Sequence, residues 1–149
     1  AKLQLAANLL AETTQNMRLV VEHLHERYPD RDNVKRLHKN FNPKKVKEIL
    51  PTSKFTAYSE NKGENLAFCT TKTKEGDSLI DKNTLTFVAL HELSHIATKS
   101  IGHTTEFWEN FKFILENAVE KGIYKPVDYK NKPKGYCGMT ITDNPFYDL

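Results

Sequence analysis

Residues 91–95 read His-Glu-Leu-Ser-His, and this spacing of side chains can hold a metal ion. On a helix, positions four apart lie on one face, so His91 and His95 can present two imidazoles to the same ion. Glu92 is rotated off the ligand direction, so its carboxylate can reach a water molecule at the metal rather than the metal itself. Two nitrogen ligands, a third from elsewhere, an open position for water and a carboxylate base are what a metallohydrolase needs.

The segment that leads into this motif favours a helix. Asn83 is a candidate N-cap, and residues 84–90 form a mostly apolar run that ends at His91. A buried helix that carries two histidines and a glutamate is hard to explain by packing alone, because polar groups are unfavourable in a core. We therefore predict a metal-binding helix rather than a core helix with hydrogen-bonded histidines.

A third histidine, His103, follows His95 by eight residues. Gly102 suits a left-handed turn that would end the helix and bring His103 back beneath the metal. A following helix would begin at Thr104 or Thr105. Three acidic residues remain alternatives for the third ligand: Glu106, Glu109 and Asp128. Glu109 is the strongest of these, because a glutamate on a second helix is a common ligand in zinc sites.

The motif and the segment Gly-His-Thr-Thr-Glu-Phe-Trp at 102–108 together resemble the active-site region of the WLM metallopeptidases. These enzymes are relatives of the SprT/Spartan proteases, which degrade proteins crosslinked to DNA. In that group the third histidine is followed by Phe, often Phe-Trp, as Phe107 and Trp108 follow His103. Residues 122–126 and 136–139 further resemble small WLM-like proteins of large DNA viruses. The resemblance is specific over residues 81–138.

This resemblance implies one zinc ion per chain, held by His91, His95 and His103, with Glu92 as general base and acid. It also implies a compact α+β, zincin-like protease domain and a zinc-dependent endopeptidase that acts on DNA-bound or DNA-crosslinked proteins. The sequence does not determine the group that stabilises the oxyanion. Zinc itself can serve, and Tyr136 is a candidate.

Two other functions stay open. One is a general intracellular or viral peptidase without DNA dependence. The other is a nucleic-acid-binding module with a structural zinc and no activity. The presence of Glu92 argues against the second, because a purely structural site has no use for a base.

Basic residues are unevenly spread along the chain, whose net charge is +3. Residues 31–54 hold eight basic and two acidic side chains, and residues 121–134 hold five lysines and one aspartate. Such patches suit phosphate contacts, although a solvated lysine-rich surface is the simpler reading of composition alone. The resemblance shifts the balance toward DNA. The candidate nucleic-acid contacts are Lys44, Lys45, Lys47, Lys130, Lys132 and Lys134.

The length of 149 residues fits a single domain, 1–149, that can bury a core. No apolar run is long enough to span a membrane, and no signal peptide or lipidation pattern is recognisable. Cys69 and Cys137 are expected to be free thiols, with a bridge between them or a metal contact as the alternative. We expect a monomeric intracellular protein, cytoplasmic or nuclear, with a viral origin as an open alternative. Its expected partners are a protein or peptide substrate and DNA.

The remaining elements follow from periodicity and turn residues. Apolar positions at helical spacing predict one long helix over 3–28 and a short one over 33–40. Asn42 and Pro43 predict the start of another short helix that runs to Leu50. Two strands are expected at 55–59 and 66–71, forming a small antiparallel sheet whose edge could bind substrate or merely cover the core.

After the motif, apolar residues from Phe107 to Val119 predict a helix that ends at Gly122. Its aromatic residues, Trp108 included, are expected to belong to the core. From about residue 125 the chain is irregular, and its aromatic residues predict that it wraps around the domain.

Overall fold

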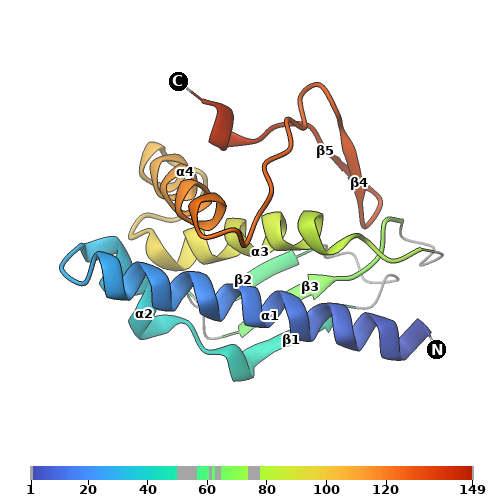
Figure 1. Cartoon of the computed structure of the whole chain (residues 1–149), viewed down its shortest axis with the longest axis horizontal. Coiled ribbons are helices and arrows are strands. Elements are labelled where there is room, and N and C mark those ends of the chain that lie inside the picture. Colours follow the sequence, from blue (N-terminus) through green and yellow to red (C-terminus); the bar gives the residue numbers. More distant parts are fainter. Residues whose placement is uncertain (1, 50–56, 61, 63–64, 74–77, 149) are drawn as a thin grey trace.

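The computed structural model describes residues 2–49, 57–60, 62, 65–73 and 78–148. The helices are α1 (Lys2–Arg27), α2 (Asp32–Asn40), α3 (Lys82–Ala97) and α4 (Thr105–Glu120), with 3-10 turns η1 (Pro43–Lys45) and η2 (Pro145–Tyr147). The strands are β1 (Val46–Ile49), β2 (Ala57–Glu60), β3 (Asn65–Cys69), β4 (Lys134–Tyr136) and β5 (Met139–Ile141). The fold is α+β, as predicted (Figure 1).

The long N-terminal helix and the short helix after it confirm the periodicity argument. The buried side chains of α1 recur at helical spacing, at Thr13, Met17, Val20, Val21 and Leu24. The helix ends at Arg27 because Pro29 disfavours a helical conformation for the residue before it. In α2, Val34 and Leu37 turn toward the same core.

The helix predicted from Pro43 to Leu50 is wrong. Asn42 does act as the cap, since its Oδ1 accepts a hydrogen bond from the Lys44 backbone N–H at 3.0 Å. Only one 3-10 turn follows before the chain becomes β1, whose residues pair in parallel with residues 66–69 of β3. Pairing with a distant strand thus outweighs the local helix-start signal, and Leu50 lies outside the described residues.

The larger sheet has the strand order β1-β3-β2 and is mixed rather than antiparallel. β1 runs parallel to β3, whereas β2 runs antiparallel to it. β3 is central and buried, so the expected strand at 66–71 is confirmed through Cys69. The expected strand at 55–59 is found in part: β2 begins at Ala57, and residues 55 and 56 are outside the described residues. Among the described strands, β2 pairs only with β3 and forms an edge of this sheet.

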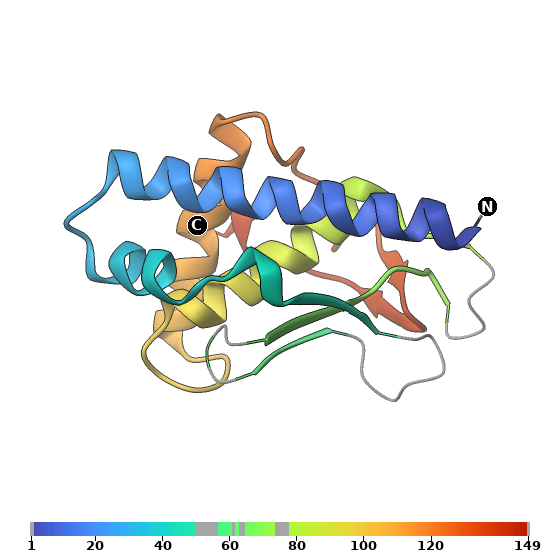
Figure 2. The ribbon, with the colours of Figure 1, turned by 90° about the horizontal axis from the view of Figure 1, so that it is seen from below.

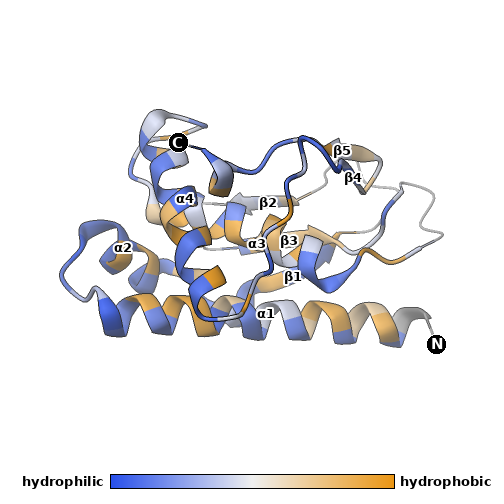
Figure 3. Ribbon diagram, turned by 45° about the horizontal axis from the view of Figure 1, so that its top comes forward, coloured by the Kyte–Doolittle hydropathy of each residue, from blue (hydrophilic) through white to orange (hydrophobic). Residues whose placement is uncertain are grey.

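Helix α3 is the centre of the fold, since it packs against α1, α2, α4 and β2. Figure 2 shows it between α1 and the sheet, and Figure 3 shows apolar residues concentrated along α3 and β3. Its N-cap is Asp81, not the predicted Asn83: Asp81 Oδ2 accepts the Thr84 N–H at 2.9 Å. Asn83 instead exchanges two hydrogen bonds with the backbone of Lys125, which anchors the start of the C-terminal segment.

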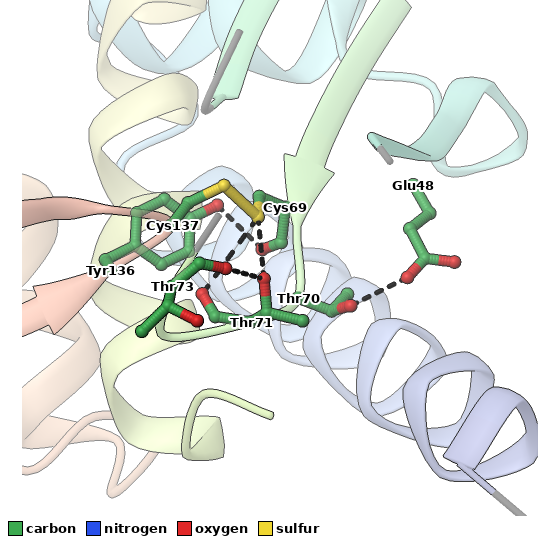
Figure 4. The surroundings of a disulfide bond; sticks show 7 residues. All are labelled: Glu48, Cys69, Thr70, Thr71, Thr73, Tyr136 and Cys137. Carbon is green, nitrogen blue, oxygen red and sulfur yellow. Dashed lines mark hydrogen bonds between the residues drawn. A yellow bond between two sulfur atoms is a disulfide. The ribbon is translucent and has the colours of Figure 1, made fainter. Parts of the chain in front are cut away.

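The C-terminal segment wraps around the domain, as its aromatic residues predicted, with Tyr129 and Tyr136 buried. It is less irregular than expected, because β4 and β5 form a hairpin. The expectation of free thiols is wrong: Cys69 at the end of β3 and Cys137 in the hairpin turn form a disulfide (Figure 4). The expectation of an intracellular protein therefore has no support from free thiols. None of the described helices has the length and apolarity to cross a membrane.

Candidate metal centre

Three histidines converge at one point beside α3. Candidate ligand nitrogens of His91, His95 and His103 all lie within 4.8 Å of one another. His91 and His95 come from successive turns of α3, and His91 Nε2 lies 3.2 Å from His103 Nε2. Zinc–nitrogen bonds of about 2.0–2.1 Å in a tetrahedral site separate two ligand nitrogens by roughly 3.3 Å. The cluster therefore fits a metal ion with three imidazole ligands.

A short loop between α3 and α4 brings His103 to the other two histidines. The helix already ends at Ala97, with Thr98 in an extended conformation. Gly102 therefore does not cap α3 but makes a left-handed turn directly before His103, with φ of +85°. Thr104 then caps α4, its Oγ1 accepting the Phe107 N–H at 3.2 Å. The predicted left-handed turn at Gly102 is present, but it lies in the loop after α3 and does not end the helix.

The acidic residue Glu106 holds this loop in place. Its carboxylate accepts hydrogen bonds from the backbone N–H groups of Lys99 and Ser100, both at 3.1 Å, and from the Ser100 hydroxyl at 2.7 Å. These hydrogen bonds, that of the Ser100 hydroxyl first, lower the pKa of Glu106 from 4.5 to about 2. Among the described residues, the cluster does not include the alternative ligands Glu106, Glu109 and Asp128.

Two basic side chains bind the C-terminal end of α3. Lys62 Nζ donates to the backbone carbonyls of His95, Thr98 and Ser100 at 3.0, 2.9 and 2.7 Å. Arg36 donates to the carbonyl of Ala97 at 2.6 Å. Cations at a helix C-terminus compensate carbonyls that have no partner within the helix. Sequence reasoning missed both residues, because neither belongs to a motif and both lie far from α3 in the chain.

Phe107 explains why an aromatic residue follows the third histidine. Its buried ring packs against all three imidazoles, with centroid distances of 5.2 Å to His91, 4.3 Å to His95 and 4.7 Å to His103. Phe107 thus belongs to the core, as predicted. Trp108 does not: it is 40% exposed and lines a hollow next to the histidines, so its assignment to the core was wrong.

The surroundings favour neutral imidazoles at the centre. Burial, reinforced by the charges of His91, His103 and Lys62 and opposed by Glu92, lowers the pKa of His95 from 6.5 to about 4. Burial also lowers the pKa of His103. A metal ion binds the neutral form of histidine, so these two side chains are in the ligand-competent state near neutral pH.

Glu92 contacts His91 at Nδ1, the ring nitrogen that does not face His103. Its side chain is 6% exposed, and Oε2 is 2.8 Å from His91 Nδ1. A carboxylate there favours a proton on Nδ1, which leaves the Nε2 lone pair of His91 directed toward His103 and the centre. Glu92 also contributes to the wall of the hollow that contains the histidines.

The histidines open into a hollow of about 590 Å³. One wall consists of Ala57, Tyr58 and Ser59 of β2, and the loop at Ile101 and Gly102 forms another. The sheet edge next to the metal centre is therefore the first predicted strand rather than the second, which lies in the middle of the sheet.

Tyr136, the candidate oxyanion stabiliser, lies near but not in this hollow. It lines the adjoining hollow together with His91 and Glu92, and burial raises the pKa of its hydroxyl. The hydroxyl donates a hydrogen bond to the Cys69 carbonyl at 2.8 Å (Figure 4). In this arrangement Tyr136 positions the end of β3, and its role in catalysis stays a prediction.

The structure does not bring the six candidate nucleic-acid contacts together. Lys44, Lys45 and Lys47 are exposed on η1 and β1, at the bottom of Figure 1. Residues 130–134 lie at the start of the C-terminal hairpin, at the top of the same view. Lys134 also forms an ion pair with Asp81 at 3.1 Å. The two basic segments are therefore separate surfaces on opposite sides of the molecule.

Comparison with known proteins finds relatives in viruses. An uncharacterised protein of Acanthamoeba polyphaga mimivirus is 35% identical over 97 residues, which are 65% of this chain and 49% of the relative. An uncharacterised protein of Invertebrate iridescent virus 3 is 44% identical over 61 residues (40% of this chain, 36% of the relative). One of Invertebrate iridescent virus 6 is 36% identical over 77 residues (50% and 41%). The chain thus spans at most about half the length of these relatives. No family model matches the chain, and no solved structure does.

Proposed function

We propose that this protein is a zinc-dependent endopeptidase with a zincin-like fold, related to the WLM metallopeptidases that its motif resembles. The observation that carries the proposal is the convergence of three imidazoles beside a nearly buried carboxylate, in a hollow bounded by the edge of a sheet. Each part matches a requirement of metal-assisted peptide hydrolysis: ligands, base and a surface for an extended chain.

The openness of the centre favours catalysis over a structural zinc. Structural sites use four protein ligands, whereas catalytic sites use three and keep one position for water or substrate. Among the described residues, the cluster holds three candidate ligands, His91, His95 and His103. The exposed side of the cluster faces the hollow, so a fourth position there would be reachable from solvent.

The residues of the chain divide the chemistry between them. A zinc ion held by the three imidazoles would polarise the peptide carbonyl and lower the pKa of a water molecule toward ~7. The Glu92 carboxylate would take the proton of the attacking water and later transfer it to the leaving amine. His91 would stay oriented through its Nδ1 contact with Glu92, and His95 and His103 through their packing on Phe107.

The substrate would bind as an additional strand on β2. This strand pairs with β3 along one edge, and its residues 57–59 line the hollow beside His91 and His95. Backbone hydrogen bonds to an edge strand hold an extended peptide regardless of its sequence. Such binding would present a peptide carbonyl to the metal centre. It would suit extended or unfolded segments of many proteins.

The decisive experiment replaces Glu92 by Gln in the zinc-loaded protein. Gln keeps a carbonyl oxygen for the contact with His91 Nδ1 but removes the base. We expect one zinc per chain by elemental analysis and a fall in kcat of at least about 100-fold on an unfolded protein substrate. His91→Ala should lose both zinc and activity, and Glu109→Gln, on the exposed face of α4, should keep both. Full turnover in Glu92→Gln with zinc retained would refute the mechanism.

We further propose that the substrates are DNA-bound or DNA-crosslinked proteins. The exposed lysines at 44, 45 and 47 form one of the two separate basic surfaces and support this proposal together with the resemblance. Charge reversal at these three positions should weaken DNA binding for all sequences alike and make it less dependent on salt. It should slow cleavage of a DNA-bound protein but not of a short free peptide. Equal cleavage with and without DNA at low salt would leave a peptidase without DNA dependence.

A further inference from the structure

A second hollow of about 300 Å³ adjoins the metal centre. It shares Ala57, His91 and Glu92 with the hollow that contains the three histidines. The two hollows are therefore parts of one cleft that meet at the proposed reacting groups. Anything bound in the second hollow would lie within one or two residues of the bond to be cleaved.

The second hollow is more strongly apolar than the first. Its large apolar side chains come from three separate elements: Phe87 and Val88 of α3, Trp108 and Phe111 of α4, and Met139 and Ile141 of β5. Trp108 and Met139 are 40% and 49% exposed, so two large apolar side chains of this hollow are accessible to a ligand. An exposed apolar surface beside convergent polar groups is characteristic of a binding site.

The wall that the C-terminal hairpin contributes is held firmly. The Cys69–Cys137 disulfide joins the hairpin turn to the end of β3 (Figure 4). The backbone N–H of Cys137 also donates to the Thr71 carbonyl at 2.8 Å, and that of Gly138 to the Lys72 carbonyl at 3.1 Å. Met139 follows this anchored turn directly. The hollow is thus formed before a ligand arrives, which favours selective binding.

We propose that this hollow is a specificity pocket that takes one large apolar or aromatic side chain of the substrate, next to the scissile bond. This rests on the proposed peptidase function. The volume is at the lower end of the ~300–1,000 Å³ typical of ligand sites, which suits a single side chain. The other half of the cleft places the polar groups of Ser59, Lys62 and the histidines beside Tyr58 and Ile101, so the stronger selection for apolar residues is expected on the side of the second hollow.

The test uses matched peptides that differ at one position, occupied by Phe, Leu, Ala or Glu, with products mapped by mass spectrometry. Cleavage should fall consistently on the same side of Phe or Leu. Their kcat/KM should exceed that of the Ala peptide by at least about 10-fold, with Glu slowest. Met139→Glu should lower the ratio of kcat/KM for the Phe peptide to kcat/KM for the Ala peptide by about 10-fold. Thr140→Glu adds the same charge to the next residue, which points to the opposite face of β5, and should leave the ratio unchanged.

A second readout does not depend on hydrolysis. Trp108 is the one tryptophan of the sequence, so its fluorescence reports on the pocket. In Glu92→Gln, the Phe peptide should shift the Trp108 emission at a concentration about 10-fold lower than the Ala peptide does. If this shift occurs but the wild type cleaves nothing, the pocket stands and the peptidase function fails. If all peptides are cleaved equally and Met139→Glu changes no ratio, the pocket is overturned and the peptidase stands.

Discussion

Replacement of Lys62 by Met should destabilise the C-terminal end of α3. The Lys62 ammonium group bonds three backbone carbonyls, of which those of His95 and Thr98 belong to the end of α3 and that of Ser100 to the loop before His103. Met preserves most of the aliphatic length but donates no hydrogen bond. The substitution therefore isolates the contribution of the charged donor to the position of His95 and His103, two of the three candidate ligands.

The expected loss of stability is about 1–2 kcal/mol. Hydrogen bonds that involve a charged group each contribute roughly 1.5–3 kcal/mol when water is excluded. The Lys62 side chain is only half-buried, so water replaces part of this interaction in the variant. Interaction with the helix dipole adds about 0.3–1 kcal/mol at a partly exposed helix end. For a chain of this length, a loss of about 1–2 kcal/mol after this replacement by water corresponds to a fall in Tm of roughly 3–6 °C.

The measurement is thermal unfolding in the presence of a chelator, because bound metal would otherwise add its own stabilisation. Lys99→Met is the matched control, since Lys99 is exposed at the same helix end and uses only its backbone N–H in the contacts described. Lys62→Arg should recover part of the loss. If Lys62→Met and Lys99→Met have the same Tm within about 1 °C, the carbonyl contacts do not stabilise the helix end and the reasoning fails.

Two further predictions concern the loop that carries the third histidine. His103→Ala should weaken zinc binding by at least about 100-fold in a competition titration, whereas Glu109→Gln should change it less than about 2-fold; the reverse result would identify Glu109 as the ligand. Glu106 has a pKa of about 2 in the folded protein, below its ordinary 4.5. The ionised carboxylate of Glu106 should therefore stabilise the folded protein fully above pH 4.5, and this stabilisation should disappear as the pH falls toward 2. Without metal, wild type should have a higher Tm than Glu106→Gln at pH 7, and the difference should vanish near pH 2; a difference that does not vary with pH would contradict this origin.

Features that depend on neighbours in sequence could be predicted from the chain. The helical periods of α1 and α4, the cap at Thr104 and the turn at Gly102 all express local preferences of a few residues. The histidine cluster belongs to this class as well. Its three histidines lie within thirteen residues, and one helix and one turn are enough to bring them together.

Features that depend on distant segments could not be predicted. A helix-start signal at Asn42 precedes β1, yet the residues of β1 pair with a strand about twenty residues away. Cys69 and Cys137 are 68 positions apart, and only the wrapping of the C-terminal segment brings them together. Lys62 lies in the connection between two strands, and no local pattern links it to the carbonyls of α3.

The same division separates the chemistry of the proposed site from its selectivity. The ligands and the base lie within residues 91–103, a contiguous stretch of the chain. The walls that a substrate would touch include residues 57–59 of β2 and residues 139 and 141 of β5, which tertiary structure alone brings to the centre. Substitutions that abolish the reaction are therefore expected mainly inside the motif. Those that change which peptide is cut are expected at these walls, and a motif search would not reveal them.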